Sequence, residues 1–183
     1  MSQKPVVINL YGGPGSGKST SATGVFSALK LAGVNTEYVP EFAKDATWEQ
    51  RGRKVFAAQE YIFGKQHFRL SRVADQVDVT VTDSPMLISL AYMAPDYKLP
   101  SLSRVIFEAY ELYDNIDVFL VRTKEYNPSG RSQSEEEAKK LDYRIKNILD
   151  YNVGPGNYHE VIADKNAIAK IVEIYNNHKE NRK

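Results

Sequence analysis

The sequence predicts an α/β fold: a five-stranded parallel sheet with helices on both faces and a lid that carries arginine. Two observations predict this fold. Short, nearly continuous apolar segments recur along the chain, and segments with helical apolar spacing lie between them. Because alternating strands and helices form right-handed βαβ units, the strands should lie parallel in one sheet. Ligands of such folds bind at the carboxyl ends of the strands.

The first half of the chain contains three predicted strands and two predicted helices. An apolar strand at residues 6–11 leads through a glycine-rich loop into a helix at residues 19–31. A short strand at residues 36–39 ends at a proline. The apolar side chains of residues 48–75 are spaced for a long helix, and residues 78–82 return to a strand pattern. This half therefore alternates between strand and helix.

The second half repeats the alternation. Residues 103–113 have the spacing of a helix, and residues 117–121 form an apolar strand. A charged amphipathic helix is predicted at residues 135–149. Residues 158–163 are a strand, and residues 167–176 form a closing helix. The polar groups that follow these strands should therefore meet at one edge of the sheet.

The composition predicts a single domain, residues 1–183. A chain with 42% hydrophobic residues and this length can bury its own core without disulfides or structural metal. Lys and Arg total 24 against 23 for Asp and Glu, so the net charge of +1 creates no overall attraction to polyanions. The absence of cysteine excludes thiolate metal sites and cysteine nucleophiles. We find no signal peptide or membrane-spanning pattern and expect a cytoplasmic protein without a membrane partner.

A glycine-rich loop follows the first predicted strand. Residues 12–19 read GGPGSGKS and match G-x-x-x-x-G-K-[ST], with a strand before them and a helix after them, as in the P-loop NTPase fold. Glycines let backbone N–H groups fold around phosphate oxygens, and the helix N-terminus adds partial positive charge. The residues expected to bind ATP here are Gly13, Pro14, Gly15, Ser16, Gly17, Lys18, Ser19 and Thr20.

Three side chains predict how ATP and Mg²⁺, the expected cofactors, are held. Lys18 is expected to bridge the β- and γ-phosphates, and the Ser19 hydroxyl to bind Mg²⁺. Asp83 ends the third predicted strand in the sequence TVTDSP, where a parallel sheet would place it beside the phosphate loop. We assign it to the metal and to catalysis as the Walker B carboxylate. The alternative is an aspartate that only begins the turn before Pro85.

A second carboxylate marks the predicted acceptor site. Glu41 follows the second predicted strand and should point into the same cleft. A carboxylate within reach of an acceptor hydroxyl can orient that hydroxyl and accept its proton as the phosphoryl group moves. We therefore assign Glu41 to catalysis and substrate binding. The alternative is a solvated glutamate on a surface loop.

Two further residues are candidates for binding the acceptor. Gln59 lies in an apolar helical stretch, where its amide could pair with a nucleobase edge while aromatic rings stack on the base. It could equally be a buried amide. Trp48 is assigned to the same pocket, although aromatic residues at helical spacing are more often part of the core.

Residues 123–137 are predicted to form the lid. Their sequence, TKEYNPSGRSQSEEE, combines turn formers with charge. Arginines delivered by a closing loop can neutralise the transferring phosphoryl group only when the site is shut. We assign Arg122, at the end of the fourth strand, to ATP binding and Arg131 to catalysis, and leave the role of Arg144 open. The alternative is a set of exposed charges paired with neighbouring glutamates.

Together these motifs resemble the P-loop kinases that include deoxynucleoside kinases and the AAA-like kinase domain of nicotinamide riboside kinase. The resemblance covers nearly the whole chain and implies an ATP-dependent phosphotransferase with an alcohol group as acceptor. Glu41 matches the family's glutamate after the second strand, and Gln59 its base-reading glutamine. Arg122 and Arg131 match its lid arginines. Deoxynucleoside kinases carry an arginine after the third-strand carboxylate, where this chain has Ser84.

The sequence is more closely similar to small bacteriophage kinases at residues 8–19, 41–45 and 82–85. Some of that group phosphorylate 5-hydroxymethyluracil in DNA, so the resemblance implies modified DNA as the partner, in thymidine hypermodification inside an infected host cell. A base in duplex DNA would have to be flipped into the cleft. A charged helix face is often only solvated, but a DNA backbone would need basic residues such as Lys44, Arg51, Arg53, Lys54, Arg69 and Arg72.

Three interpretations of function stay open. The acceptor is a free deoxynucleoside, nucleoside monophosphate or nicotinamide riboside, or it is a modified base within DNA. The third interpretation is a regulatory ATPase whose product is a conformational change. The sequence leaves the oligomeric state undetermined. It disfavours a GTPase, because the nearest candidate for the guanine motif, TKEY at residues 123–126, lacks the aspartate.

Overall fold

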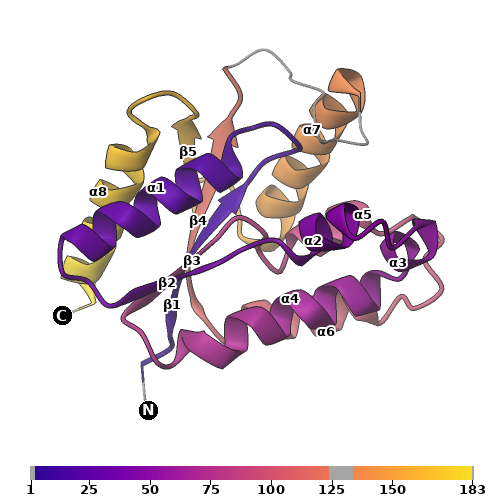
Figure 1. The fold of residues 1–183 in the computed structure, drawn as a ribbon, viewed down its shortest axis with the longest axis horizontal. Helices are drawn as coiled ribbons and strands as arrows, with labels where there is room; N and C mark the ends of the chain where they lie inside the picture. The colour runs from indigo at the N-terminus through magenta and orange to yellow at the C-terminus, as the bar shows by residue number, and fades with distance from the viewer. Residues whose placement is uncertain (1–2, 124–133, 183) are drawn as a thin grey trace.

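The computed structural model describes residues 3–123 and 134–182, and these residues form the predicted α/β fold. Five parallel strands make one sheet in the order β2-β3-β1-β4-β5 (Figure 1). The strands are β1 Val6–Tyr11, β2 Thr36–Val39, β3 Val79–Thr82, β4 Asp114–Val121 and β5 His159–Ile162. With β1 at the centre, the loop that follows it opens in the middle of the carboxyl edge.

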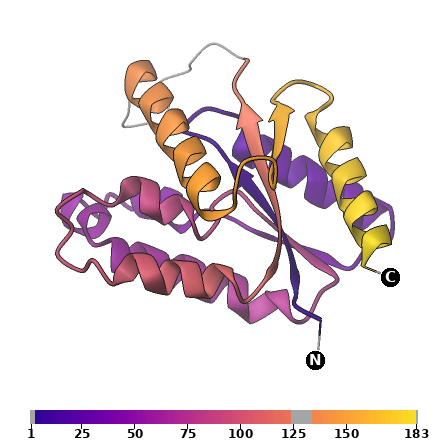
Figure 2. The same cartoon turned by 180° about the vertical axis from the view of Figure 1, so that it is seen from behind.

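Helices cover both faces of the sheet. α1 and α8 pack together on one face, and α4, α5, α6 and α7 lie on the other, as the view from behind also shows (Figure 2). The helices are α1 Lys18–Leu31, α2 Phe42–Trp48, α3 Arg53–Ala57, α4 Gln59–Ala74, α5 Ile88–Tyr92, α6 Leu102–Tyr110, α7 Glu135–Asn152 and α8 Ala167–Asn181.

The central strand explains why the strand signal in the sequence is a continuous apolar run. Val6, Ile8 and Leu10 of β1 point to the core beneath α1 and α8. Val7 and Tyr11 point to the core beneath the opposite layer of helices. Because both faces are buried, neither set of alternating positions can be polar without a partner.

The five predicted strands are confirmed; β3 differs from the predicted bounds by one residue at its start, β5 by one residue at each end, and β4 differs most. β2 has the predicted bounds, while β4 begins at Asp114, before the predicted start at residue 117. The apolar pattern missed this extension because Asp114 and Asn115 are polar, yet they pair in register with Val6 and Val7 of β1. α6, α7 and α8 differ from the predicted helices only at their ends, and α1 begins one residue before the predicted start.

The predicted single helix at residues 48–75 is wrong. The chain forms three helices there, because α2 begins earlier and ends at Trp48, and α3 and α4 are separate. Gln50 and Gly52 have positive φ angles of 52° and 77°, which a continuing helix does not allow. Ala58 then interrupts the chain between α3 and α4 with φ −90° and ψ 77°. The short α5 was also not predicted.

The central part of the predicted lid, residues 124–133, lies outside the described residues, and so does Arg131. The C-terminal flank begins α7 with a capping box: the Ser134 hydroxyl accepts the Glu137 N–H, and the Glu137 carboxylate accepts the Ser134 N–H. Within residues 3–123 and 134–182, no helix is long and apolar enough to cross a membrane.

Candidate active site

The phosphate loop joins β1 to α1 in a conformation that requires glycine. Gly12 has φ 142°, and a Cβ on it would lie 2.4 Å from the Ser16 Oγ. The Ser16 N–H donates to the Gly13 oxygen at 3.2 Å, and the Ser21 N–H donates to the Gly17 oxygen at 2.9 Å as α1 begins. The sequence motif is therefore folded as a tight loop that ends on a helix N-terminus.

Lys18 lies at the start of α1 and bends back over this loop. Its Nζ donates to the Gly12 oxygen at 2.7 Å and to the Gly13 oxygen at 3.1 Å. Burial lowers the pKa of the Lys18 ammonium, while nearby carboxylates, first Glu41 and then Asp83, act to raise it. The structure thus brings together Lys18 and the two carboxylates singled out from the sequence.

The two predicted carboxylates are tied to each other through the backbone. Asp83 follows β3 and is 2% exposed, and its Oδ1 accepts the Glu41 N–H at 3.0 Å. Burial raises the pKa of the Glu41 carboxyl, and Asp83 adds to this, while Lys18 and Lys44 act in the opposite direction. A raised carboxyl pKa is what a proton acceptor near neutral pH needs.

Two tyrosines that the sequence analysis missed lie beside these groups. Burial raises the pKa of the Tyr38 phenol on β2, and the charges of Asp83 and Glu41 add to the shift. Burial likewise raises the pKa of Tyr92 at the end of α5, next to the charges of Glu41 and Asp142. Both phenols therefore stay neutral and can donate hydrogen bonds. Tyr38 lies three residues before Glu41, which is the only sequence signal that pointed to it.

A buried glutamine holds the segment that carries Glu41. The Gln66 Oε1 on α4 accepts the Phe42 N–H at 2.9 Å, and its Nε2 donates to the Pro40 oxygen at 3.4 Å. Gln66 is 3% exposed and was not singled out from the sequence. The predicted base reader, Gln59, instead donates from Nε2 to the Phe56 oxygen at 2.7 Å. Its role in base recognition stays a prediction.

The predicted acceptor surface around α2 contains one strongly exposed aromatic residue. Trp48 is 70% exposed at the end of α2. Arg51 and Arg69, two of the basic residues proposed for DNA, lie over the Phe42 ring at 5.7 and 5.1 Å from its centroid. They also form ion pairs, Arg51 with Glu49 and Arg69 with Asp45. These two arginines therefore contribute to local packing.

Arg122 and Arg144 contact groups that the sequence did not indicate. The Arg122 guanidinium, at the end of β4, donates to the Asp142 carboxylate on α7 and to the Pro14 oxygen of the phosphate loop. The Arg144 Nη2 on α7 donates to the Leu90 oxygen at 3.3 Å and to the Met93 oxygen. Arg122 thus contacts the phosphate loop, its role in ATP binding stays a prediction, and Arg144 attaches α7 to α5.

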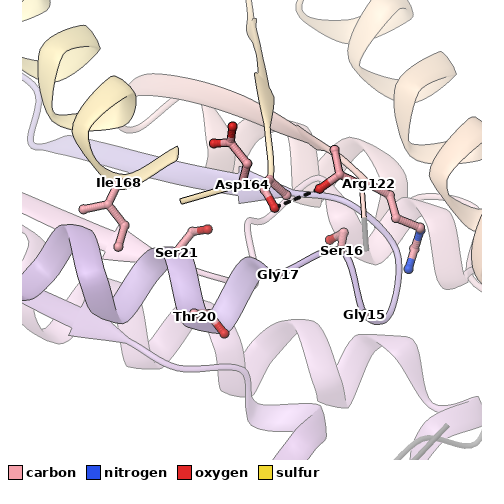
Figure 3. A pocket seen from close by; sticks show the side chains of 10 residues that line it. Gly15, Ser16, Gly17, Thr20, Ser21, Arg122, Asp164 and Ile168 are labelled. Carbon is pink, nitrogen blue, oxygen red and sulfur yellow. Dashed lines mark hydrogen bonds between the residues drawn. The ribbon is translucent and has the colours of Figure 1, made fainter. Parts of the chain in front are cut away.

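A pocket lies between the phosphate loop and the ends of β4 and β5 (Figure 3). The Thr123 Oγ1 donates to the Ala163 oxygen at 3.2 Å across the two strand ends, shown as the dashed line. The sequence analysis did not predict the side of the pocket formed by Ala163, Asp164 and Ile168, because no motif marks these residues. The lining residues are Gly15, Ser16, Gly17, Thr20, Ser21, Arg122, Thr123, Ala163, Asp164 and Ile168.

The loop and its neighbours fit a nucleotide with a magnesium ion. Within the described part of the chain, the buried Ser16 Oγ of the loop has no hydrogen-bond partner, and a phosphate oxygen or water can satisfy it. Ser19 and Asp83 offer the hard oxygen ligands that Mg²⁺ prefers. Among the described residues no group of three or more His, Asp or Glu side chains could hold a metal alone.

Comparisons with known proteins agree with this architecture. The model of a protein family described as AAA domain matches residues 7–165. The crystal structure of thymidylate kinase from Ehrlichia chaffeensis is similar, with a TM-score of 0.59 and 13% identity over 96% of this chain and 99% of that chain. No curated protein matches the sequence. The likeness in structure shows the fold, which is that of P-loop NTPases.

Proposed function

The chain belongs to the AAA domain family whose model matches residues 7–165, and from this premise we propose that it is an ATP-dependent phosphotransferase with an alcohol group as acceptor. The observation that carries the proposal is the meeting of Lys18, Glu41 and Asp83 at the carboxyl edge of the sheet. A cation at the phosphate loop, a buried carboxylate beside it and a second carboxylate with a raised pKa are the groups that phosphoryl transfer to a hydroxyl requires.

The proposed reaction assigns each group one task. Lys18 and the loop N–H groups hold the phosphates, and Glu41 orients the acceptor hydroxyl. The hydroxyl oxygen forms a bond to the γ-phosphorus, the bond from that phosphorus to the β–γ bridging oxygen breaks, and the hydroxyl proton passes to Glu41. ADP and the phosphorylated acceptor are the products. Ser19 and Asp83 would hold Mg²⁺, which would supply charge neutralisation at the phosphate oxygens.

The proposed acceptor is a nucleotide-type molecule, and the sharper proposal is the hydroxymethyl group of 5-hydroxymethyluracil in phage DNA, acted on in the cytoplasm of an infected cell. The similarity to bacteriophage kinases noted above supports it. So does the charge of residues 42–72, which contain seven Lys and Arg against three Asp and Glu in a chain of net charge +1. Trp48, exposed within this segment, offers a surface on which a base can stack.

A free small molecule is the second candidate acceptor. The similar structure is described as a thymidylate kinase, which favours a nucleoside monophosphate or a related nucleoside over a polymer. The engagement of Arg51 and Arg69 with Phe42 also reduces the number of basic residues free to meet a DNA backbone. A regulatory ATPase without an acceptor is the third candidate.

One assay separates these candidates. Labelled ATP is incubated with the protein, Mg²⁺ and a panel of free deoxynucleosides, nucleoside monophosphates, nicotinamide riboside, unmodified DNA and DNA containing 5-hydroxymethyluracil. Label in the modified DNA alone supports the DNA proposal, and label in a free molecule replaces it with a metabolite kinase. Hydrolysis with no labelled acceptor contradicts the phosphotransferase proposal and favours the regulatory ATPase.

A further inference from the structure

The Asp142 carboxylate joins α7 to the phosphate loop. Its Oδ1 accepts the Gly13 N–H, and its Oδ2 accepts the Arg122 Nε–H at 3.1 Å and an Nη2–H at 2.8 Å. The Arg122 Nη1 donates to the Pro14 oxygen at 2.9 Å. The two charged side chains are 11% and 19% exposed, so their contact is largely shielded from water.

α7 packs closely against the phosphate loop at Gly13. A Cβ on Gly13 would lie 2.6 Å from the Ala138 oxygen and 2.8 Å from the Asp142 Oδ1. Ala138 and Asp142 are four residues apart, so they lie on one face of the helix. The position of α7 therefore fixes the first part of the loop.

Asp142 leaves the anion-binding end of the loop open. Its partner, Gly13, lies near β1, whereas the donors that a helix offers to an anion belong to its first turn. Among the described residues, no side chain caps the first turn of α1, which follows Gly17. Asp142 therefore supports the loop without competing for the place where a phosphate would bind.

The same contacts fix the direction of Arg122. A guanidinium has five N–H groups, and three of those on Arg122 are used by Asp142 and Pro14. The remaining two belong to its terminal nitrogens, and Arg122 lines the pocket beside Gly15 and Ser16 (Figure 3). A phosphate oxygen accepts such paired donors well.

From these contacts we infer that Asp142 is a positioning residue for ATP: it holds Arg122 and the first part of the phosphate loop in the arrangement that binds the nucleotide. The inference rests on the proposed function, because it concerns the same ATP site. It adds a residue that no motif in the sequence marks. It also connects α7, which begins at Glu135, to the phosphate loop through Gly13 and Arg122.

The first test is the substitution Asp142→Asn, which keeps the volume and removes the charge. We expect the Kd for ATP with Mg²⁺, measured by isothermal titration calorimetry, to rise about tenfold, and the KM for ATP to rise more than kcat falls. The matched control is Asp150→Asn on the same helix, where the carboxylate accepts the Tyr158 hydroxyl at 2.7 Å. This control should change the Kd for ATP less than about twofold.

The second test asks whether Asp142 acts through Arg122. Replacing only one of them leaves a charge without its partner, so the double variant Arg122→Gln/Asp142→Asn is compared with Arg122→Gln. Adding Asp142→Asn to Arg122→Gln should change the Kd for ATP less than about twofold. Circular dichroism on heating shows whether each variant is folded. Full additivity of the two losses would contradict the inference.

The outcomes separate the inference from the proposed function. If the unsubstituted protein binds ATP and folded Asp142→Asn binds it equally well, the inference is wrong and the proposed function stands. If the unsubstituted protein binds no ATP with Mg²⁺, the proposed function fails and the inference fails with it. A weakened Kd in Asp142→Asn, without the same change in Asp150→Asn and without additivity, supports it.

Discussion

Burial and charge act on Lys18 in opposite directions. Burial lowers the pKa of its ammonium group, and the neighbouring carboxylates, Glu41 foremost, raise it. A polyphosphate at the loop would add negative charge on the side that the carboxylates do not cover, and so stabilise the protonated form further. The protonated form of Lys18 is therefore stabilised most when a nucleotide is bound.

The first prediction concerns this lysine. Lys18→Ala should lower phosphoryl transfer about a hundredfold or more, because a cation aimed at the transferring charge is lost. The fold should persist, since the removed ammonium was a buried charge bonded only to the carbonyls of Gly12 and Gly13. Transfer from labelled ATP and a thermal melt measure the two effects. Lys30→Ala, which removes an exposed lysine paired with Glu37, is the control and should keep full activity.

The second prediction concerns Glu41 and pH. Glu41→Gln should lower kcat about 10²- to 10⁴-fold while leaving the Kd for ATP nearly unchanged, because an amide cannot accept the acceptor's proton. The native pKa of Glu41 is raised above 4.5, so the wild-type activity should decline toward acid at a pH above that value as the carboxylate is protonated. The residual activity of Glu41→Gln should lack this decline. A variant with undiminished kcat would remove Glu41 as the base.

At the scale of elements, the short turn from β2 to α2 decides where Glu41 points. Asp83 holds it from β3 through the Glu41 N–H, and Gln66 holds it from α4 through the Phe42 N–H and the Pro40 oxygen. Two elements distant in the sequence from the turn thus hold one catalytic candidate. A rigid support of this kind keeps a base within reach of its proton.

The third prediction tests this support. Gln66→Ala leaves the buried Phe42 N–H without its acceptor, which should cost about 1–3 kcal/mol of unfolding free energy. It should also lower kcat, because the turn that carries Glu41 loosens. Urea unfolding and the transfer assay measure the two losses. Gln76 lies just beyond α4, and its exposed side chain donates to the Arg72 oxygen, so Gln76→Ala should change neither by much. Equal effects of both substitutions would contradict the supporting role.

Sequence analysis could single out candidate site residues where these residues come soon after a predicted strand. Glu41 and Asp83 follow strands directly, and Lys18 begins the helix after the loop that follows β1, so the parallel sheet brings the three together. Asp142 was missed because its contact with Gly13 spans 129 residues along the chain and leaves no local pattern. The helix at residues 48–75 was predicted as one because apolar spacing continues across Gly52, where the backbone turns.

On the scale of the whole molecule, a buried polar network joins the sheet to α6. The Asp117 carboxylate on β4 is 2% exposed and accepts hydrogen bonds from the Asn9 Nδ2 at 3.0 Å and from the Tyr110 hydroxyl. Asn9 also donates to the Asn115 Oδ1 at 2.9 Å. This network explains why β4 continues through polar residues. Burial raises the pKa of Asp117, and these hydrogen bonds only partly oppose the shift.

The fourth prediction follows from that raised pKa. As pH rises from about 4 to about 7, the unfolded chain releases the Asp117 proton before the folded protein does, so this residue lowers the unfolding free energy. Each unit by which the folded pKa is raised contributes about 1.4 kcal/mol to this loss. Asp117→Asn removes this pH-dependent loss of unfolding free energy. The amide oxygen can still accept from Asn9, and the Tyr110 hydroxyl can turn to accept from the new amide nitrogen.

Urea unfolding of both proteins across this pH range measures the difference. The unfolding free energy of Asp117→Asn minus that of the wild type should grow as pH rises, because only the wild type carries the buried acid. Glu135→Gln is a control of opposite sign, since the nearby Lys139 lowers the pKa of Glu135 and its charge stabilises the fold above that pKa. For Glu135→Gln the same difference should shrink with rising pH. A constant difference for Asp117→Asn would mean that the folded and unfolded chains bind this proton equally.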